Sequence, residues 1–367
     1  MRILLLTHAI KVGSLSNYVK RLGMSLETMA EVDIFNNGNL YKGPNSHAEM
    51  SKDLFLKNEW RPFRTWITYK RFLRENEDFY DIIHICSQRF AFLASGPKYL
   101  VTYHDIFPFS SNESDANTFY FTNASIGEKL RHSYFRRNIV KNSLRGINIV
   151  TDSESTRCDL IRVFSYEPNL IHVIPYPLDL TFKKTKKVNA RKKLGLPESV
   201  KIVLFVSSDE YRKNIGLRMR YIRDLPEKTH LINVGPLDID LVPANVLPRI
   251  HQFESISDET LSLLYDASDL FVSASFEEGF DVPVIEAMAH GVSVLVSDIP
   301  VHREIVGNHG TFFDPRDYDD FFTKICHCLS VTEESRLEDI FCLSKFSPRN
   351  IGNELFNLYL DVISHGH

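Results

Sequence analysis

The stretch SASFEEGFDVPVIEAMAHG, residues 273–291, contains three structural signals in a row. It begins inside an apolar, β-branched run, DLFVSAS, which predicts a buried strand. A short loop follows, and Pro283 then suits the first turn of a helix, where its missing N–H costs nothing. Gly291 is typical of the residue that ends a helix. The stretch therefore predicts a strand, a loop and a helix, the repeating unit of an open parallel sheet.

Two carboxylates flank this turn: Glu278 lies in the loop and Glu286 about one turn into the helix. The plain interpretation is a solvated loop acid and a favourable charge near a helix N-terminus. The alternative is a site for a phosphorylated, hydroxyl-rich ligand. Free backbone N–H groups at the helix start, over Val282–Ile285, would face a diphosphate with the helix dipole behind them, and Pro283 and Val284 lie within this stretch. The Glu286 carboxylate could accept hydrogen bonds from a ribose.

Working outward, apolar strands alternate with helical patterns along the whole chain, which predicts parallel sheets covered on both faces. The predicted strands of the first half are 2–7, 32–35, 80–86, 99–105 and 147–153. Those of the second half are 201–208, 230–236, 250–257, 269–275, 292–298 and 310–315, with helices at 258–267, 283–290 and 316–330.

A polar, strongly basic segment after residue 180, TFKKTKKVNARKKLG, reads as a linker that leads into a helix. We predict two doubly wound Rossmann-like domains that face each other across a cleft. The first covers 1–180 and is joined by a closing helix over 347–364, and the second covers 181–346. Ligands of such sheets bind beyond the carboxyl ends of the strands.

The composition excludes several classes of protein. With 43% apolar residues and a formal net charge of −4, the chain is globular rather than disordered. No apolar run approaches the roughly 20 residues of a membrane span, and the short apolar start is predicted to be a strand rather than a signal peptide. The five cysteines have no metal-cluster spacing, and we expect a reducing, cytoplasmic setting.

The stretch EGFDVPVIEAMAHG resembles EGFGLPxxEAMAxG, the signature of the retaining glycosyltransferases of family 4, which have the two-domain GT-B fold. The resemblance extends along nearly the whole chain, in six other segments that follow the order of the family pattern. The other matching segments are VTYHDIFP (101–108), TDSESTRCDLIR (151–162), IHVIPYPLD (171–179), YRKN (211–214), SDETLSLLYDASDLFVSAS (257–275) and FSPRNIGNELFNLYLDV (346–362).

The resemblance implies transfer of a sugar from a nucleotide-sugar with retention of the anomeric configuration. It places Glu278 near the hydroxyls of the donor sugar, Glu286 on the nucleotide ribose, and Lys213 on the diphosphate. A cation there would stabilise the charge that gathers on the leaving group. Arg212 adds a fork that can grip two oxygens, and a surface cation is its plainer interpretation.

In the first domain, the resemblance implies that His104 contacts the donor sugar or the reaction centre, whereas a half-buried structural histidine is the alternative. Gly13 would let the first loop approach the diphosphate. The chain departs from the family pattern at Ser14, Ser208 and Asp281, where Gly, Arg and Gly are usual. The charge of Asp281 beside a diphosphate is unfavourable, although Asp tolerates a left-handed turn.

Neither a metal nor a bound cofactor is expected, because cations and a helix N-terminus can balance the diphosphate. The expected mechanism is attack on the same face, with the leaving phosphate as the base, and the expected donor is GDP-mannose or a UDP-hexose. The predicted function is hexosyl transfer to a glycan or lipid-linked acceptor in polysaccharide or glycolipid synthesis. The alternatives are a non-catalytic GT-B subunit of a glycosylation complex and a GT-B nucleotide-sugar epimerase.

The stretches 54–74 and 129–145 are basic and contain interleaved aromatic residues. They fit peripheral docking on the anionic inner face of a membrane, and they fit equally well ordinary amphipathic helices that pack on the sheet. Single-stranded nucleic acid also selects basic and aromatic residues, but the acidic balance of the chain and the sugar-transfer motifs do not favour it.

Overall fold

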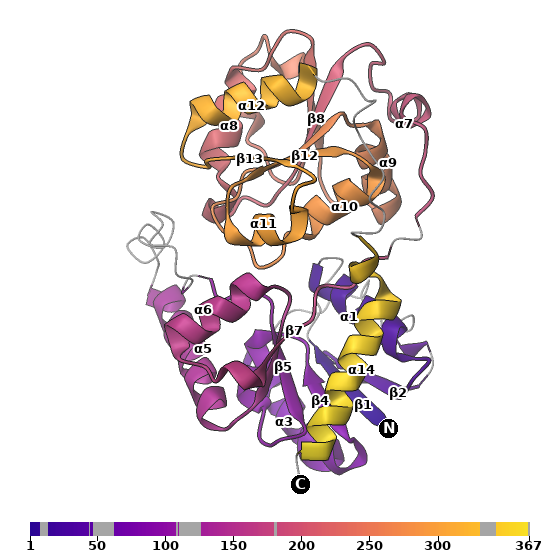
Figure 1. Cartoon of the computed structure of the whole chain (residues 1–367), viewed down its shortest axis with the longest axis vertical. Helices are drawn as coiled ribbons and strands as arrows, with labels where there is room; N and C mark the ends of the chain where they lie inside the picture. The colour runs from indigo at the N-terminus through magenta and orange to yellow at the C-terminus, as the bar shows by residue number, and fades with distance from the viewer. Residues whose placement is uncertain are drawn as a thin grey trace. The chain divides into compact units, whose positions relative to one another are not determined.

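The structure is a computed structural model, which describes residues 1–7, 14–43, 45–46, 62–107, 109, 126–179, 182–330 and 343–365. The chain forms two compact units (Figure 1). The first comprises Met1–Asp179 together with Ser344–His367, and the second comprises Leu180–Leu343. Each unit is built on a mainly parallel sheet with helices on its faces, which confirms the predicted pair of doubly wound domains.

A seven-stranded sheet forms the centre of the first unit, in the order β3-β2-β1-β4-β5-β6-β7. The strands are β1 (Arg2–Thr7), β2 (Glu31–Asn36), β3 (Asn39–Tyr41), β4 (Ile82–Ile85), β5 (Tyr99–Tyr103), β6 (Asn148–Thr151) and β7 (Ile171–Val173). The helices are α1 (Ser14–Leu26), α3 (Pro62–Asn76), α5 (Ile126–Leu144), α6 (Glu154–Phe164) and α14 (Pro348–His365).

The edge strand β3 was not predicted, and it runs antiparallel to β2. Its cause is the Asn-Gly pair at positions 37 and 38, where both residues have positive φ angles, 51° and 92°. Such a pair favours a two-residue hairpin turn whose twist matches the strands that it joins. The sequence signal was therefore present, but the pairing strand is only three residues long.

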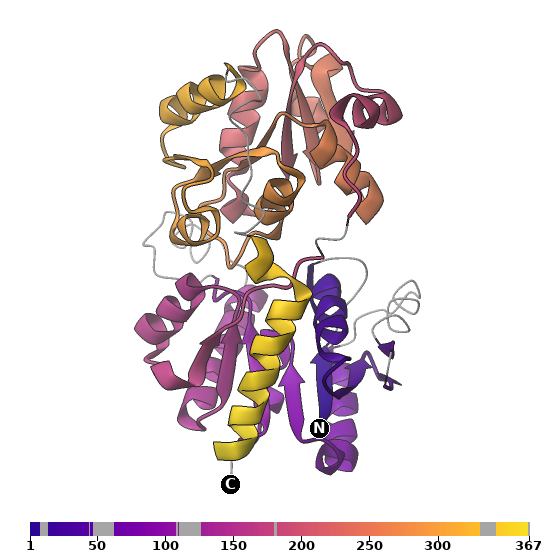
Figure 2. The same cartoon turned by 45° about the vertical axis from the view of Figure 1, so that its right-hand side comes forward.

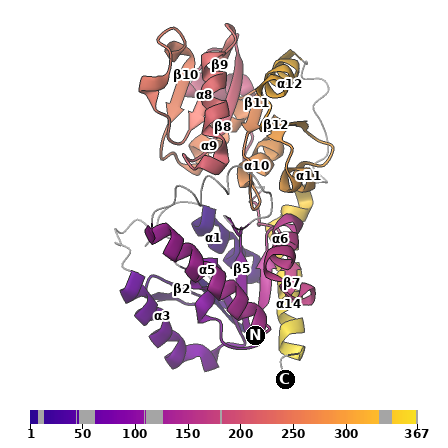
Figure 3. The same cartoon turned by 90° about the vertical axis from the view of Figure 1, so that its left-hand side faces the viewer.

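Alternating residues of β4 and β5 separate the two faces of the first sheet. Ile83, Ile85 and Val101 pack in one apolar cluster with Tyr69 of α3 and Ile139 of α5. The intervening His84 and Thr102 face the other side and bond to Tyr359 of α14 and Tyr18 of α1. Figure 3 shows α3 and α5 on the opposite side of the sheet from α14.

The last helix, α14, runs alongside α1 although the two are more than 300 residues apart in the sequence (Figure 2). Gly352 makes this close approach possible. A Cβ atom at this position would lie 2.3 Å from the carbonyl oxygen of Ser25 in α1. The end of the chain therefore completes the core of the first unit.

A six-stranded sheet forms the centre of the second unit, in the order β10-β9-β8-β11-β12-β13. The strands are β8 (Lys201–Val206), β9 (Thr229–Val234), β10 (Ile250–Phe253), β11 (Leu270–Ser273), β12 (Ser293–Ser297) and β13 (Thr311–Phe313), all parallel to their neighbours. The helices are α7 (Lys187–Leu194), α8 (Ile215–Arg223), α9 (Asp258–Ala267), α10 (Val282–His290), α11 (Pro300–Val306) and α12 (Tyr318–Ser330).

Several strands are shorter than predicted because the residues after them leave the sheet to cap helices. The predicted strand over 147–153 ends at Thr151, and the Ser153 side chain accepts a bond from the backbone of Thr156 at the start of α6. The predicted strand over 250–257 ends at Phe253, and Ser257 caps α9 in the same way. The polar ends of these segments therefore lie in loops at the carboxyl edge of each sheet.

Among the residues that the structure describes, none of the helices has both the length and the apolar character that spanning a membrane would require.

Candidate active site

The strand order of the second sheet reverses between β8 and β11, which pair with each other. At such a point the loops that follow the two strands diverge and leave room for a ligand. Here the loop after β8 carries Arg212 and Lys213, and the loop after β11 carries Glu278. The two loops are tied together, because the backbone N–H of Phe276 donates to the carbonyl oxygen of Arg212 at 2.8 Å.

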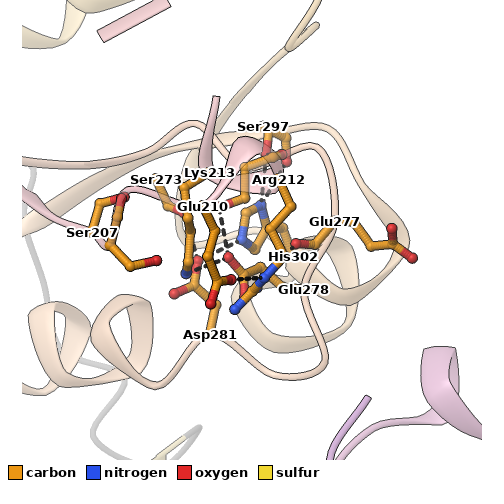
Figure 4. A network of polar contacts seen from close by, with 12 residues as sticks. Ser207, Glu210, Arg212, Lys213, Ser273, Glu277, Glu278, Asp281, Ser297 and His302 are labelled. Carbon is orange, nitrogen blue, oxygen red and sulfur yellow. Dashed lines mark hydrogen bonds and ion pairs between the residues drawn. The ribbon is translucent and has the colours of Figure 1, made fainter. Parts of the chain in front are cut away.

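Glu278 lies between two cations, as Figure 4 shows. Its Oε2 atom is 2.6 Å from Nη1 of Arg212, and its Oε1 atom is 2.5 Å from Nζ of Lys213. The hydroxyl of Ser275 donates a further bond to Oε1 at 2.6 Å. The Glu278 side chain is only 5% exposed. The structure thus brings together three residues that the sequence analysis assigned separately to the sugar and the diphosphate.

Charge interactions keep both members of the Lys213–Glu278 pair ionised. Burial would raise the pKa of the Glu278 carboxyl, but the charges of Arg212 and Lys213 outweigh it and hold the pKa below its ordinary value. Burial would likewise lower the pKa of Lys213, and the carboxylates of Glu278 and Asp281 raise it instead. The loop therefore holds fixed charges of both signs at the carboxyl edge of the sheet.

Arg212 contacts a second carboxylate as well, because its Nε atom lies 2.5 Å from Oε2 of the more exposed Glu210. Ser208 stands at the position where the family pattern has an arginine, and the carbonyl oxygen of Ser208 accepts a bond from the hydroxyl of Ser207. Arg212 and Lys213 are therefore the cations at the end of this loop that face Glu278.

The start of α10 offers fewer backbone donors than the sequence predicts. Pro283 falls in the first turn, as expected, and a proline has no N–H group to donate. The N–H of Val284 already donates to the carbonyl oxygen of Asp281 at 3.0 Å. The expected row of free N–H groups is thus interrupted at two of its members, although the helix dipole still favours an anion in front of Val282.

Asp281 adopts a left-handed conformation, with φ of 62° and ψ of 64°, directly before α10. Its side chain makes no capping bond to that helix. The Oδ2 atom instead accepts a bond from Ser273 at 2.5 Å and lies 2.9 Å from Nε2 of His302 in α11. Burial would raise the pKa of Asp281, but the charge of Lys213 and the contacts with His302 lower it. The carboxylate is therefore directed at His302 rather than at the helix start.

Glu286 lies on the second turn of α10, where its Oε2 atom accepts a bond from the hydroxyl of Tyr265 at 3.1 Å. Tyr265 belongs to α9 and stacks on His290 at the end of α10. A buried pair of Asp266 and His290, 2.7 Å apart, fixes that histidine in turn. Glu286 is thus held by a side chain that orients it, on the helix that begins at the Asp281 turn.

His104 of the first unit follows β5, and it pairs with Asp152, which follows the adjacent strand β6. The Nδ1 atom of His104 is 2.6 Å from Oδ2 of Asp152, and the Nε2 atom is 3.2 Å from the carbonyl oxygen of Cys86. Burial would lower the pKa of His104, but Asp152 and the Cys86 carbonyl raise it above its ordinary value. The histidine keeps 22% exposure, so it is neither a surface group nor a fully enclosed one.

The remaining predicted position, Gly13, lies outside the described residues. Within the described part of the chain, the structure contains no group of three His, Cys, Asp or Glu side chains arranged to hold a metal ion.

The sequence analysis missed the residues that support this site, namely Ser273, Ser275, Ser297, His302 and, in the first unit, Asp152. Four of them come from the ends of strands or the residues just beyond them, where a polar side chain marks the carboxyl edge of a sheet. His302 had no comparable signal, because it lies inside a helical pattern next to apolar residues.

The fold defines a protein with two Rossmann-like α/β units, and the second unit carries a cluster of charged residues at the carboxyl edge of its sheet. Two family models match the chain: "Glycosyltransferase Family 4" over residues 15–182 and "Glycosyl transferases group 1" over residues 200–331. Together the matches cover most of both units. The chain belongs to the glycosyltransferases of family 4 type, and its fold is GT-B.

Curated relatives are similar to parts of the chain. An "O-antigen chain mannosyltransferase B" of Escherichia coli is 26% identical over 260 residues, which cover 65% of this chain and 67% of the relative. An "MMP alpha-(1->4)-mannosyltransferase" of Mycolicibacterium hassiacum is 25% identical over 191 residues, 51% of this chain and 46% of the relative. The matched regions thus span about half to two thirds of these relatives.

Among solved structures, HepE of Anabaena "in complex with UDP and glucose" matches with a TM-score of 0.73 at 16% identity, over 98% of this chain and all of that chain. WaaG, "a glycosyltransferase involved in lipopolysaccharide biosynthesis", matches with a TM-score of 0.67 at 14% identity, over 100% of this chain and 99% of that chain. At this level of identity the likeness concerns the fold.

Proposed function

We propose that the protein is a retaining glycosyltransferase that transfers a hexose of mannose or glucose type from a nucleoside diphosphate sugar. The observation that carries the proposal is the pairing of Glu278 with Arg212 and Lys213 at the strand-order reversal of the second unit. The two cations suit a diphosphate, and the carboxylate suits sugar hydroxyls. The two mannosyltransferase relatives favour mannose, and the HepE complex favours a UDP-linked glucose.

In the proposed reaction, an acceptor hydroxyl forms a bond to the anomeric carbon while the bond from that carbon to the phosphate oxygen breaks. The electron pair of the broken bond goes to the nucleoside diphosphate, which also takes the proton of the hydroxyl. Lys213 and Arg212 stabilise the charge that develops on the leaving phosphate. Glu286 holds the ribose, and Glu278 orients the sugar as the cations turn toward the phosphates.

His104 is proposed to donate hydrogen bonds to the donor sugar. Its contacts with Asp152 and the Cys86 carbonyl place acceptors at both ring nitrogens. A sugar hydroxyl would replace the longer and weaker of these contacts, that of Nε2 at 3.2 Å. Asp152 would keep the ring oriented during this exchange.

The proposed acceptor is a glycan or a lipid-linked sugar, and we propose that α5 and α3 bring the first unit to an anionic membrane surface. The α5 helix exposes Leu130, Tyr134 and Leu144, by 66%, 48% and 85%, beside the exposed cations Arg136 and Arg137. In this proposal the exposed apolar side chains enter the membrane interface while the cations attract anionic headgroups.

The α3 helix contains side chains that fit each of the two interpretations of its basic stretch. Tyr69 is fully buried, and Phe72 stacks on Phe35 of the sheet, as ordinary packing requires. Trp66 and Ile67 remain exposed, and Lys70 lies over the Trp66 ring at 4.4 Å. Of the aromatic residues in the basic stretch 54–74, Trp60 lies outside the described residues, as does the side chain of Phe63.

The function is tested by incubating the purified chain with GDP-mannose, UDP-glucose and UDP-galactose and measuring release of the nucleoside diphosphate with and without lipid-linked acceptors. We expect release from one of these donors, with the α configuration of the donor preserved in the product by NMR. An inverted product would refute the retaining mechanism. Binding without release from any donor would instead favour a non-catalytic member of the family.

Membrane docking is tested separately by co-sedimentation with vesicles of phosphatidylglycerol and of phosphatidylcholine. We expect binding to the anionic vesicles that is lost when Arg136 and Arg137 are both changed to Glu. The matched control changes Lys192 and Lys193 of α7 to Glu, which reverses two exposed charges on the second unit. Equal loss in both variants would show a non-specific charge effect and would contradict docking through α5.

A further inference from the structure

A buried pair of Asp281 and His302 lies beneath the proposed donor site. The His302 side chain is fully buried and that of Asp281 is 2% exposed, with 2.9 Å between Nε2 and Oδ2. The family pattern has glycine at position 281, so neither the left-handed turn nor ordinary helix capping calls for a carboxylate here. A buried carboxylate without a partner is strongly unfavourable. The Asp281 carboxylate therefore depends on its contact with His302.

The His302 ring has a hydrogen-bond partner at each of its two nitrogens. The Nδ1 atom lies 2.8 Å from the carbonyl oxygen of Ser297, which can only accept, so Nδ1 carries a proton. The Ser297 hydroxyl is also 3.1 Å from Nδ1, but it donates its own proton to the carbonyl of Ser275. The Nε2 atom faces the carboxylate of Asp281. The ring therefore has an acceptor within hydrogen-bond distance of each nitrogen, which is the arrangement that a ring donating from both nitrogens requires.

This pair is continuous with the charged loop, as Figure 4 shows. Ser275 accepts from Ser297 through its carbonyl and donates to Glu278 through its hydroxyl. Burial raises the pKa of the Asp281 carboxyl, and the charge of Lys213 acts in the opposite direction and lowers it. Without a cation at His302, the Asp281 carboxylate would compete for Lys213 and would oppose any anion that Lys213 binds.

We infer that His302 is a positioning residue of the donor site: its positive charge neutralises Asp281, so that Lys213 remains available to a diphosphate, and it fixes the turn from which α10 starts. This inference rests on the proposed function. In the usual family pattern an uncharged glycine stands at position 281, so the donor site has no extra negative charge to neutralise. Asp281 and His302 therefore act as one unit, and losing either alone is worse than losing both.

A double-mutant cycle tests this coupling. The variants are His302→Leu, Asp281→Gly and the double variant, and the readout is the Kd for UDP and GDP by calorimetry beside the Kd for the matching nucleoside. We expect His302→Leu to weaken diphosphate binding about 10- to 100-fold, with little change for the nucleoside, because an unpaired carboxylate opposes the phosphates. Adding Asp281→Gly should restore most of the diphosphate affinity.

A merely structural pair gives a different pattern. In that case His302→Leu lowers the melting temperature and weakens diphosphate and nucleoside equally, or Asp281→Gly restores stability without restoring affinity, and either result overturns the inference. The matched control is His290→Leu, which removes an equally buried Asp–His pair at the other end of α10. It should affect the diphosphate and the nucleoside to the same extent.

A spectroscopic test separates this inference from the proposed function. In protein with ¹⁵N-labelled histidine, the His302 ring, assigned by its loss in His302→Leu, should show two protonated nitrogens at pH 7.5. A neutral ring would overturn the inference even if the protein transfers sugar. If no nucleotide binds but the ring is an imidazolium, the proposed function fails while the charge pairing stands.

Discussion

Replacing Glu278 with glutamine should destabilise the second unit and at the same time tighten its binding of a nucleoside diphosphate. The substitution keeps the shape of the side chain and removes the charge that lies 2.5–2.6 Å from two cations. Arg212 and Lys213 are then left as neighbouring, largely buried positive charges. A bound diphosphate restores the negative charge that the substitution removes, so the variant gains more from the ligand than the wild type does.

The size of the effect follows from the burial of the pair. Removing one partner of a buried ion pair costs about 3–5 kcal/mol. The two cations keep 14–19% exposure, and Arg212 retains Glu210, so we place the loss at about 2–3 kcal/mol. For a unit of this size each kcal/mol lowers the Tm by about 2–4 °C, which gives a fall of roughly 4–12 °C.

The assay is thermal unfolding followed by circular dichroism, with and without UDP or GDP. The ligand should raise the Tm of Glu278→Gln by more than that of the wild type, and the affinity should rise by about tenfold, equivalent to roughly 1.4 kcal/mol. The control is Glu210→Gln, which removes the more exposed partner of Arg212 and should cost at most about 1 kcal/mol. An unchanged Tm, or a loss of ligand stabilisation, in Glu278→Gln would refute the reasoning.

The same pair predicts a pH dependence. Because the pKa of Glu278 lies below its unfolded value of 4.5, its stabilising contribution is complete above that pH and is lost as the pH falls through the folded pKa. The difference in Tm between wild type and Glu278→Gln should therefore shrink below pH 4.5. A constant difference down to pH 3 would contradict the assignment of the charge to this carboxylate.

Three further predictions concern other parts of the chain. Gly235→Ala should destabilise the second unit by more than about 2 kcal/mol in urea unfolding. The φ angle of Gly235 is 109°, and the new Cβ would lie 2.0 Å from a backbone carbonyl oxygen in the loop after β8. A loss of less than about 0.5 kcal/mol would contradict this close approach. Since the folded pKa of His104 is raised, its contribution to stability is complete below about pH 6.5 and is lost as the pH rises through the folded pKa, and Asp152→Asn should abolish this dependence in a Tm–pH series; a dependence that survives in the variant would exclude Asp152 as its source. Gly352→Leu should separate α14 from α1 and lower the Tm of the first unit, whereas Asn353→Leu, one residue on at an exposed position, should not; equal losses would argue against the contact.

The sequence was sufficient to predict the fold class because apolar strands and helical patterns alternate along the whole chain, as a doubly wound parallel sheet requires. The stretch around Glu278 predicted its strand, loop and helix to within a residue or two, since Pro283 and Gly291 fix the ends of α10. The hairpin strand β3 escaped because its three residues give no periodic signal, although the Asn-Gly turn beside it did.

The candidate site could be predicted residue by residue but not as a network. Glu278, Arg212 and Lys213 were each identified, yet their mutual ion pairs depend on two loops separated by more than 60 residues meeting beside β8 and β11. The sequence analysis considered the charge of Asp281 only beside a diphosphate, because only the structure shows that His302 lies within bonding distance of it. Side-chain direction at a left-handed turn is decided by such distant partners.

The most direct test of the account is calorimetric titration of UDP and GDP into the wild type, Lys213→Ala and the control Arg220→Ala. Arg220 is an exposed cation of α8 that lies over Tyr318. We predict that one nucleoside diphosphate binds the wild type and Arg220→Ala equally, and binds Lys213→Ala about 10- to 100-fold more weakly, as expected for a charge-assisted bond worth about 1.5–3 kcal/mol. Equal binding by all three proteins would contradict the placement of the diphosphate beside Glu278.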